Sequence, residues 1–214
     1  MKRRMLALAG ALVLAACPLT ACGESSADET SVVYDMPYGS MLTADTALPV
    51  SVQYDSRFLE DGLVQKISSY YHALQAQDAA EFTAAQLPFY HEYQLAEAGG
   101  DELTDDALVK LTYESIKAEY DGKDFDYSMV DVVEYIDADG QIDTRDAMLA
   151  MLDKIAEEKG EPKVSDRAEK FVQMSIDRYL CDKGSGSKRE TAVKLDGELL
   201  FAVKLDGQWY LMYA

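Results

Sequence analysis

The sequence predicts an α+β domain, with N-terminal helices packed in a curved antiparallel β-sheet and a β-meander at the C-terminal end. Apolar residues recur at helical spacing through much of residues 59–120, whereas residues 168–213 alternate between apolar and polar as strands do. Helices followed by a run of strands is an α+β element order. We expect a signal peptide over residues 1–21, a tether and extended arm over 22–50, and a single domain over 51–214.

Three helical regions are expected in the first half of the domain. The first runs from about Leu59 to Gln77, and Asp78-Ala-Ala-Glu81 has the form of a capping box that starts the second. Gly99-Gly100 ends the second region, and Thr104 is expected to cap the third. The inward-facing residues of this third helix are expected to be Leu108, Leu111, Ile116 and Tyr120.

The middle of the chain predicts a strand and then a helix. Phe125 to Ile136 is rich in Tyr, Val and Ile, which is typical of a strand. Asp143 or Thr144 is expected to cap the helix that follows, with Gly160 and Pro162 at its end. The strand order within residues 88–165 is left open.

The hexapeptide Ala-Val-Lys-Leu-Asp-Gly occurs twice, at residues 192–197 and 202–207. Asp-Gly between alternating apolar runs predicts a hairpin, because both turn residues tolerate positive φ. We therefore expect a hairpin at Asp206-Gly207. Asp196-Gly197 is either a second hairpin or a bulged bend in one longer strand, and we prefer the hairpin.

The first residues have the form of an export signal. Lys2, Arg3 and Arg4 precede an apolar run that is shorter than the ~20 residues a membrane-spanning helix needs. Leu19-Thr20-Ala21-Cys22 has the apolar-small-small-Cys form of a lipobox, and this stretch closely resembles the signal of bacterial lipoproteins. That resemblance implies cleavage before Cys22, its acylation with palmitate-type chains, and anchoring at the extracytoplasmic face of the cell membrane.

Two alternatives to this signal stay open. Leu14-Ala15-Ala16-Cys17 is a rival lipobox, and an ordinary secretory signal is the other alternative. We prefer Cys22 because Pro18 would directly follow the lipidated residue at the rival site. With Cys17 removed and Cys22 acylated, only Cys181 remains in the mature chain, so we expect no internal disulfide.

Charge excludes one class of partner. The chain has 39 acidic and 20 basic residues, a formal net charge of −19, and such a surface is repelled by phosphate backbones. We expect no nucleic-acid partner, a membrane contact through the lipid, and an unknown ligand or protein partner. We also expect no cofactor, since the sequence has no glycine-rich phosphate loop, paired metal histidines, Cys-X-X-Cys or nucleophile elbow.

The element order resembles the cone-shaped domains of the nuclear transport factor 2-like superfamily, particularly those carried by small lipoproteins of Gram-positive bacteria. The residues that carry the likeness are Tyr70-Tyr71-His72-Ala73-Leu74-Gln75, then Asp78 and Phe82, and Asp206 to Leu211. The likeness covers about residues 57–214. It implies a curved sheet around helices, with a pocket at the wide end of the cone.

Five side chains are candidates for lining such a pocket, namely Tyr71, His72, Tyr90, His91 and Trp209. A histidine could act there as a base, and clustered aromatic rings could stack on a sugar or peptide. The competing interpretation is ordinary packing at the core or its edge, and we prefer it for the histidines and the aromatic residues.

Residues 137–146 match the metal-binding loop of an EF-hand only in part. With Gly140 at the sixth position of an EF-hand loop, Asp137, Asp139, Asp143 and Asp146 fall at ligand positions. However, Tyr135 falls at the first position, and the preceding segment reads as a strand instead of a helix. We prefer a strand end, a turn at Asp139-Gly140 and a helix cap, and expect no metal.

The expected function is non-catalytic binding of a ligand, an envelope component or a partner protein. The alternative is an isomerase- or dehydratase-like enzyme that uses His72 or a buried carboxylate. A calcium-dependent binding module is the second alternative.

Overall fold

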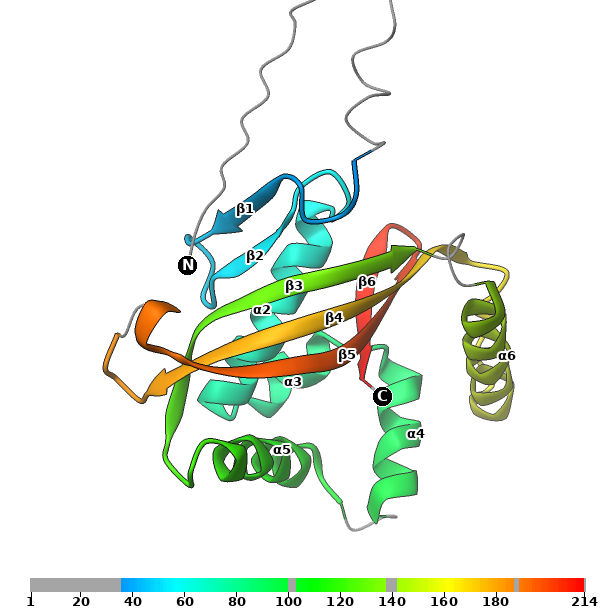
Figure 1. Cartoon of the computed structure of the whole chain (residues 1–214). Helices are drawn as coiled ribbons and strands as arrows, with labels where there is room; N and C mark the ends of the chain where they lie inside the picture. The colour runs from blue at the N-terminus through cyan, green and yellow to red at the C-terminus, as the bar shows by residue number, and fades with distance from the viewer. Residues whose placement is uncertain (1–35, 100–102, 138–141, 187–188, 214) are drawn as a thin grey trace, which may run out of the picture. The chain divides into compact units, whose positions relative to one another are not determined.

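The computed structural model describes residues 36–99, 103–137, 142–186 and 189–213, and within these ranges it is an α+β protein (Figure 1). The predicted signal peptide, which includes Cys17, and the predicted lipidation site Cys22 lie outside the described residues. The helices are α2 (Asp61–Ala76), α3 (Ala79–Ala84), α4 (Pro88–Gly99), α5 (Asp105–Glu119) and α6 (Ile142–Lys159). The strands are β1 (Leu42–Asp45), β2 (Val52–Asp55), β3 (Phe125–Asp137), β4 (Ala168–Asp182), β5 (Val193–Leu205) and β6 (Gln208–Tyr213).

The strands form one six-stranded sheet in the order β1-β2-β3-β4-β5-β6. The sheet is mixed, so the predicted antiparallel sheet is wrong at one pair: β2 and β3 are parallel, with Val52 opposite Val130. The physical reason is the connection between them, because α2 to α5 form a helical crossover and only a crossover can join parallel neighbours. β1 lies within the predicted extended arm and pairs antiparallel with β2.

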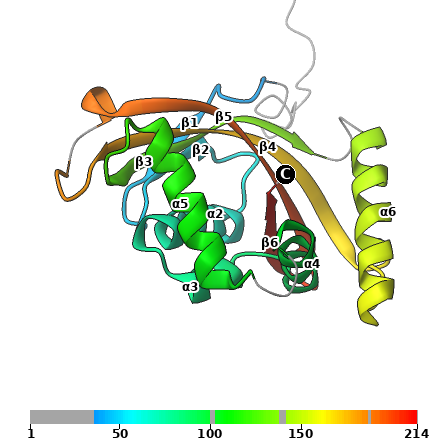
Figure 2. The same cartoon turned by 90° about the horizontal axis from the view of Figure 1, so that it is seen from below.

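Two hydrophobic cores hold the elements together. Figure 2 shows α2, α3 and α5 on one side of the sheet, and the first core joins their side chains to the strands. Its members include Leu63, Ile67, Tyr70, Tyr71, Phe82, Tyr113, Val130, Val132, Met174 and Ile176. The second core joins α4 and α6 to β4, β5 and β6, and its members include Leu87, Tyr90, Leu152, Ile155, Phe171, Phe201, Val203 and Met212.

The structure corrects the predicted starts of α3 and α6 and confirms that of α5. Asp78 caps α3 by accepting a hydrogen bond from the Glu81 amide at 3.0 Å, but the Glu81 carboxylate bonds to His72 at 2.7 Å and does not close the predicted capping box. Thr104 caps α5 as predicted. Neither Asp143 nor Thr144 is the cap of α6, because the helix already begins at Ile142.

The inward face of α5 differs from the prediction. Leu111 is 60% exposed, whereas the buried residues are Val109, Tyr113 and Ile116. These three follow one another at spacings of four and three residues, which places them on a single helical face. Leu111 lies off that face, so its predicted inward position is wrong.

The two copies of the hexapeptide have different structures. Asp206 (φ 50°) and Gly207 (φ 77°) form the tight turn between β5 and β6, so the predicted hairpin is confirmed. The preferred hairpin at Asp196-Gly197 is wrong, because β5 runs unbroken through it. Ile176 of β4 pairs with Glu198 and Arg178 pairs with Leu195. The two residues between therefore oppose the single residue Asp177, which is a β-bulge.

A buried ion pair fixes the arm to the domain. The Asp55 side chain is 0% exposed and the Arg57 side chain 5%, and Arg57 donates to the carboxylate from Nε at 2.9 Å. The same carboxylate accepts backbone amides of the arm, from Gly39 at 3.0 Å and Met41 at 3.3 Å. Tyr38 adds a hydrogen bond of 2.9 Å to the carbonyl of Val132 in β3. Residues 36–41 are thus held by Asp55 at the end of β2, by Arg57 just after it, and by β3.

Candidate functional site

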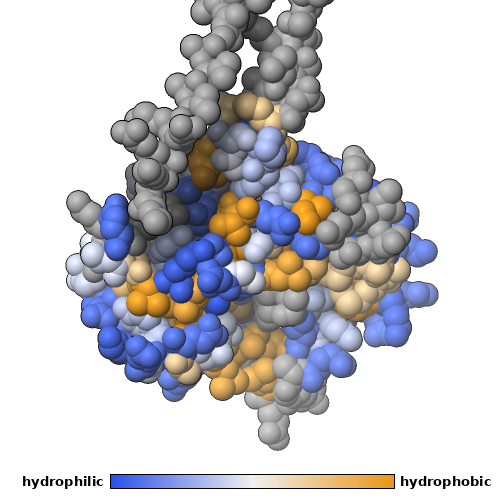
Figure 3. Space-filling view, in the orientation of Figure 1, coloured by the Kyte–Doolittle hydropathy of each residue, from blue (hydrophilic) through white to orange (hydrophobic). Residues whose placement is uncertain are grey.

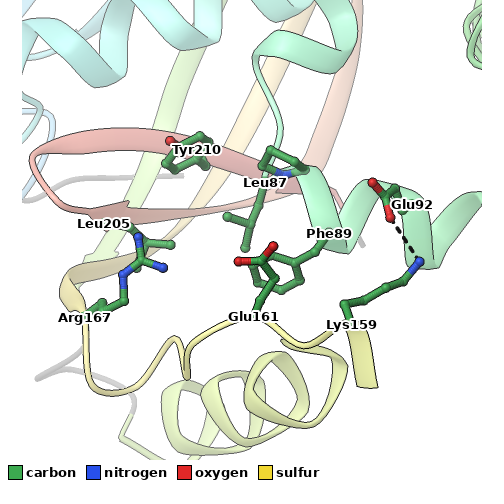
Figure 4. A pocket seen from close by; sticks show the side chains of 9 residues that line it. Leu87, Phe89, Glu92, Lys159, Glu161, Arg167, Leu205 and Tyr210 are labelled. Carbon is green, nitrogen blue, oxygen red and sulfur yellow. Dashed lines mark hydrogen bonds and ion pairs between the residues drawn. The ribbon is translucent and has the colours of Figure 1, made fainter. Parts of the chain in front are cut away.

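A cavity of about 260 Å³ opens between α4, the connection from α6 to β4, and the β5–β6 hairpin (Figure 4). Its lining residues are Leu87, Pro88, Phe89, Glu92, Lys159, Glu161, Arg167, Leu205 and Tyr210. Small-molecule sites typically combine an apolar wall with a few placed polar groups, and this lining has both. The cavity is therefore the candidate binding site.

Local structure brings three distant segments to this cavity. Leu87 donates its amide to the carbonyl of Leu211 at 3.4 Å, which places the start of α4 beside β6. Pro88 is the first residue of α4, a position where the missing proline N–H costs nothing. Gly160 (φ 74°) ends α6, and the Glu161 amide donates to the carbonyl of Ala156 at 2.8 Å in a Schellman-type turn.

Most charges around the cavity are already paired. Lys159 contacts Glu92 at 3.0 Å across the rim. The Arg167 guanidinium pairs with Asp206, its Nε lying 3.1 Å from Oδ2, and this hydrogen bonding lowers the pKa of Asp206. Glu161 forms no ion pair with any side chain in the described part of the chain, although its charge helps to raise the pKa of Arg167, an effect due first to Asp206. The cavity thus carries one unpaired carboxylate.

A second polar cluster lies beneath the sheet, away from this lining. Glu198 of β5 accepts a hydrogen bond of 2.9 Å from the hydroxyl of Tyr71 and lies 3.3 Å from Nε of Arg178. Arg178 also lies 3.6 Å from Glu119 of α5. Burial raises the pKa of Glu198, and the attraction of Arg178 offsets only part of that effect. The cluster therefore holds a carboxyl group with a raised pKa, and such a group can act as a general acid.

The five predicted pocket residues do not line the cavity, and the structure does not bring them together. Tyr71 is fully buried in the first core and belongs to the Glu198 cluster. Tyr90 is buried in the second core. Trp209 is 4% exposed and donates from Nε1 to Glu60 at 3.2 Å. At these three positions, the aromatic rings pack in the hydrophobic cores.

The two histidines make helix-to-helix contacts. His72 of α2 contacts Glu81 of α3. His91 is 2% exposed, and its ring nitrogens face the Gln86 side-chain oxygen at 3.3 Å and Asp105 of α5 at 2.8 Å. Each histidine therefore links two helices in the structure.

The weak metal candidate is only partly within the described residues. Asp139 and the side chain of Asp143 lie outside them, whereas Asp137 ends β3 and Asp146 is on α6. A strand therefore stands where an EF-hand would need its first helix. Within the described ranges, no group of three or more His, Cys, Asp or Glu side chains is placed to hold a metal ion.

Comparison with protein-family models, with curated proteins and with solved structures found no match for this chain. Of the helices that the structure describes, none has the length and apolar character needed to cross a membrane.

Sequence reasoning missed all the charged residues of the cavity. Glu161 and Arg167 lie in a connection without periodic pattern, and their neighbours in space come from residues more than 70 positions earlier, such as Leu87 and Phe89. The one local signal was Gly160 followed by Pro162, which indicated the chain reversal but not what it would face.

Proposed function

We propose that this protein is a lipid-anchored extracytoplasmic binding protein, whose domain holds a small ligand in the cavity between α4, α6 and the β5–β6 hairpin. The anchor is supported by the lipobox ending at Cys22 and by the short apolar run before it. Acyl chains would retain the protein at the membrane, because each buried methylene contributes about 0.8 kcal/mol.

The main support for ligand binding is the composition of the cavity lining. An apolar wall that includes Leu87, Phe89 and Leu205 lies against a charged rim. The volume of about 260 Å³ lies just below the usual range of about 300–1,000 Å³ for ligand pockets, so it suits a small ligand. The group best suited to acid–base chemistry, Glu198, is not among the residues that line it, which supports binding over catalysis at this cavity.

A second candidate function, an isomerase- or dehydratase-like activity, is favoured by the Glu198 cluster. A partly buried carboxyl with a raised pKa beside a tyrosine hydroxyl and an arginine is a pattern found at catalytic sites, and the Glu198 side chain is 21% exposed. A ligand found against Glu198, Tyr71 and Arg178 would support this candidate.

We further propose a cone-like domain of the nuclear transport factor 2-like kind. This is supported by the break between α2 and α3 at Gln77 (φ 55°) and by the side chains that α2 shares with the strands in the first core. An experimental structure that superposes poorly on such domains would remove this part of the proposal.

Replacing Cys22 by serine is expected to move the protein from the membrane fraction to the soluble fraction, because the acylated sulfur is lost. Cys17→Ser is the matched control and should leave the protein in the membrane fraction. Fractionation with immunoblotting, together with the intact mass of the membrane form, measures both. Release by Cys17→Ser and not by Cys22→Ser would move the lipid to the rival site. Retention of both variants would contradict the anchor.

A further inference from the structure

The cavity has a definite charge preference, and this inference rests on its being the ligand site proposed above. Of its four charged lining residues, Glu92 and Lys159 neutralise each other, and Arg167 is neutralised by Asp206. What remains is the Glu161 carboxylate. In Figure 4 this carboxylate points into the space between Arg167 and Phe89, toward Leu87. A ligand entering the cavity therefore meets one uncompensated negative charge.

The rest of the lining suits a cation attached to an apolar group. Phe89 and Tyr210 present aromatic rings, and the negative face of such a ring attracts cations within about 6 Å. The Tyr210 ring already has one cation near it, since the Lys66 ammonium lies 5.9 Å from its centroid. Leu87 and Leu205 supply aliphatic surface for the remainder of a ligand.

An anionic ligand would find no free partner at this rim. It would have to displace Asp206 from Arg167 or Glu92 from Lys159, and then lie beside Glu161. The net charge of −19 also lowers the local concentration of anions around the whole protein and raises that of cations.

The hydrophobic surface outside the cavity favours no competing site on the face seen in Figure 3. Apolar residues there form separate patches interrupted by hydrophilic side chains. Among the exposed apolar residues of the sheet, Val133 is 44% and Leu199 40% exposed, so each is still partly covered.

We propose that the cavity binds a small organic cation, an ammonium group on an apolar body, with the ammonium at Glu161 and the body against Leu87, Phe89 and Leu205. The bond is non-covalent and needs no proton transfer. The contact is partly open to solvent, so specificity for charge is expected to be modest.

Three probes of matched shape test the proposal, namely 2-phenylethylammonium, the neutral 2-phenylethanol and the anionic phenylacetate. Isothermal calorimetry on the chain from residue 23 onward, which contains every described element, should give about 3- to 10-fold tighter binding of the ammonium than of the alcohol. Glu161→Gln should reduce the affinity for the ammonium to that for the alcohol and leave the alcohol unchanged. Glu157→Gln, which removes an exposed carboxylate on α6 outside the lining, is the matched control and should change neither.

The outcomes separate the two proposals. Equal binding of ammonium and alcohol, or tightest binding of phenylacetate, would overturn the cation preference while leaving a ligand site in place. If Glu161→Gln and Glu157→Gln lower the affinity for the ammonium equally, the effect is one of general charge, and the cation preference of the cavity is also overturned. If none of the three probes binds, the cavity is not the ligand site, and both proposals fall.

Discussion

Asp55→Ala is expected to lower the free energy of unfolding by about 3 kcal/mol, because removing one partner of a buried ion pair leaves the other charge uncompensated. Arg57 would remain with its side chain 5% exposed, and the amides of Gly39 and Met41 would lose their acceptor. Urea denaturation measures the loss. Chymotrypsin should cut the variant at Tyr38 or Leu42 faster than the natural protein, since the arm is no longer held.

The effect of Asp55 should depend on pH. Hydrogen bonds from Arg57 lower the pKa of Asp55 in the folded protein from 3.8 to about 2. The stabilisation is therefore complete above pH 3.8, and it is lost as the pH falls through about 2. The difference between Asp55→Ala and the natural protein should shrink across that interval. Asp45→Ala is the control, because among the described residues this carboxylate of β1 accepts one hydrogen bond, from the Ala47 amide at 3.0 Å. Equal losses for Asp45→Ala and Asp55→Ala would contradict the role of the ion pair.

Arg178→Met is expected to destabilise the protein by a similar amount, about 3 kcal/mol near neutral pH, because Glu198 loses its nearest cation. The pKa of Glu198 is already raised by burial, and removing Arg178 raises it further. A carboxyl whose pKa is raised in the folded state favours folding at low pH. It lowers the free energy of unfolding once the pH exceeds its pKa in the unfolded chain. The deficit should therefore be larger at pH 7 than at pH 5 when measured by urea denaturation.

The double variant Arg178→Met with Glu198→Leu provides the control. Replacing a buried pair by apolar side chains is often close to neutral, so most of the stability should return. If the double variant is no more stable than Arg178→Met alone, the destabilisation comes from lost packing of the arginine and not from the stranded carboxyl.

The repeated hexapeptide shows how far local sequence decides structure. Asp-Gly permits positive φ in both copies, and this much was predictable. What distinguishes them is the length of β4, which runs to Asp182 and offers partners as far as Val193 of β5. The first copy continues the ladder through a bulge, whereas the second has no further partner strand to follow. The sequence of each copy does not show whether a neighbouring strand extends far enough to pair with it.

The helices were predictable for a different reason. Asp78 and Thr104 cap their helices through contacts only three residues away. Pairing of β2 with β3 depends instead on residues 70 or more positions apart, such as Val52 and Val130, and no local pattern encodes it. The cavity has the same origin, since Phe89, Glu161 and Tyr210 meet only through the tertiary fold. Aromatic residues that were pocket candidates, such as Tyr71, lie in the hydrophobic core.

Chemical-shift mapping of bound ligands tests the position of the ligand site most directly. Isotope-labelled protein from residue 23 onward is screened by NMR against small cations, anions and neutral compounds at millimolar concentration. We expect the largest shifts caused by any binder around the cavity, at Leu87, Phe89, Glu161, Leu205 and Tyr210. Binders whose shifts cluster at Tyr71, Arg178 and Glu198, or a screen with no binder at all, would contradict it.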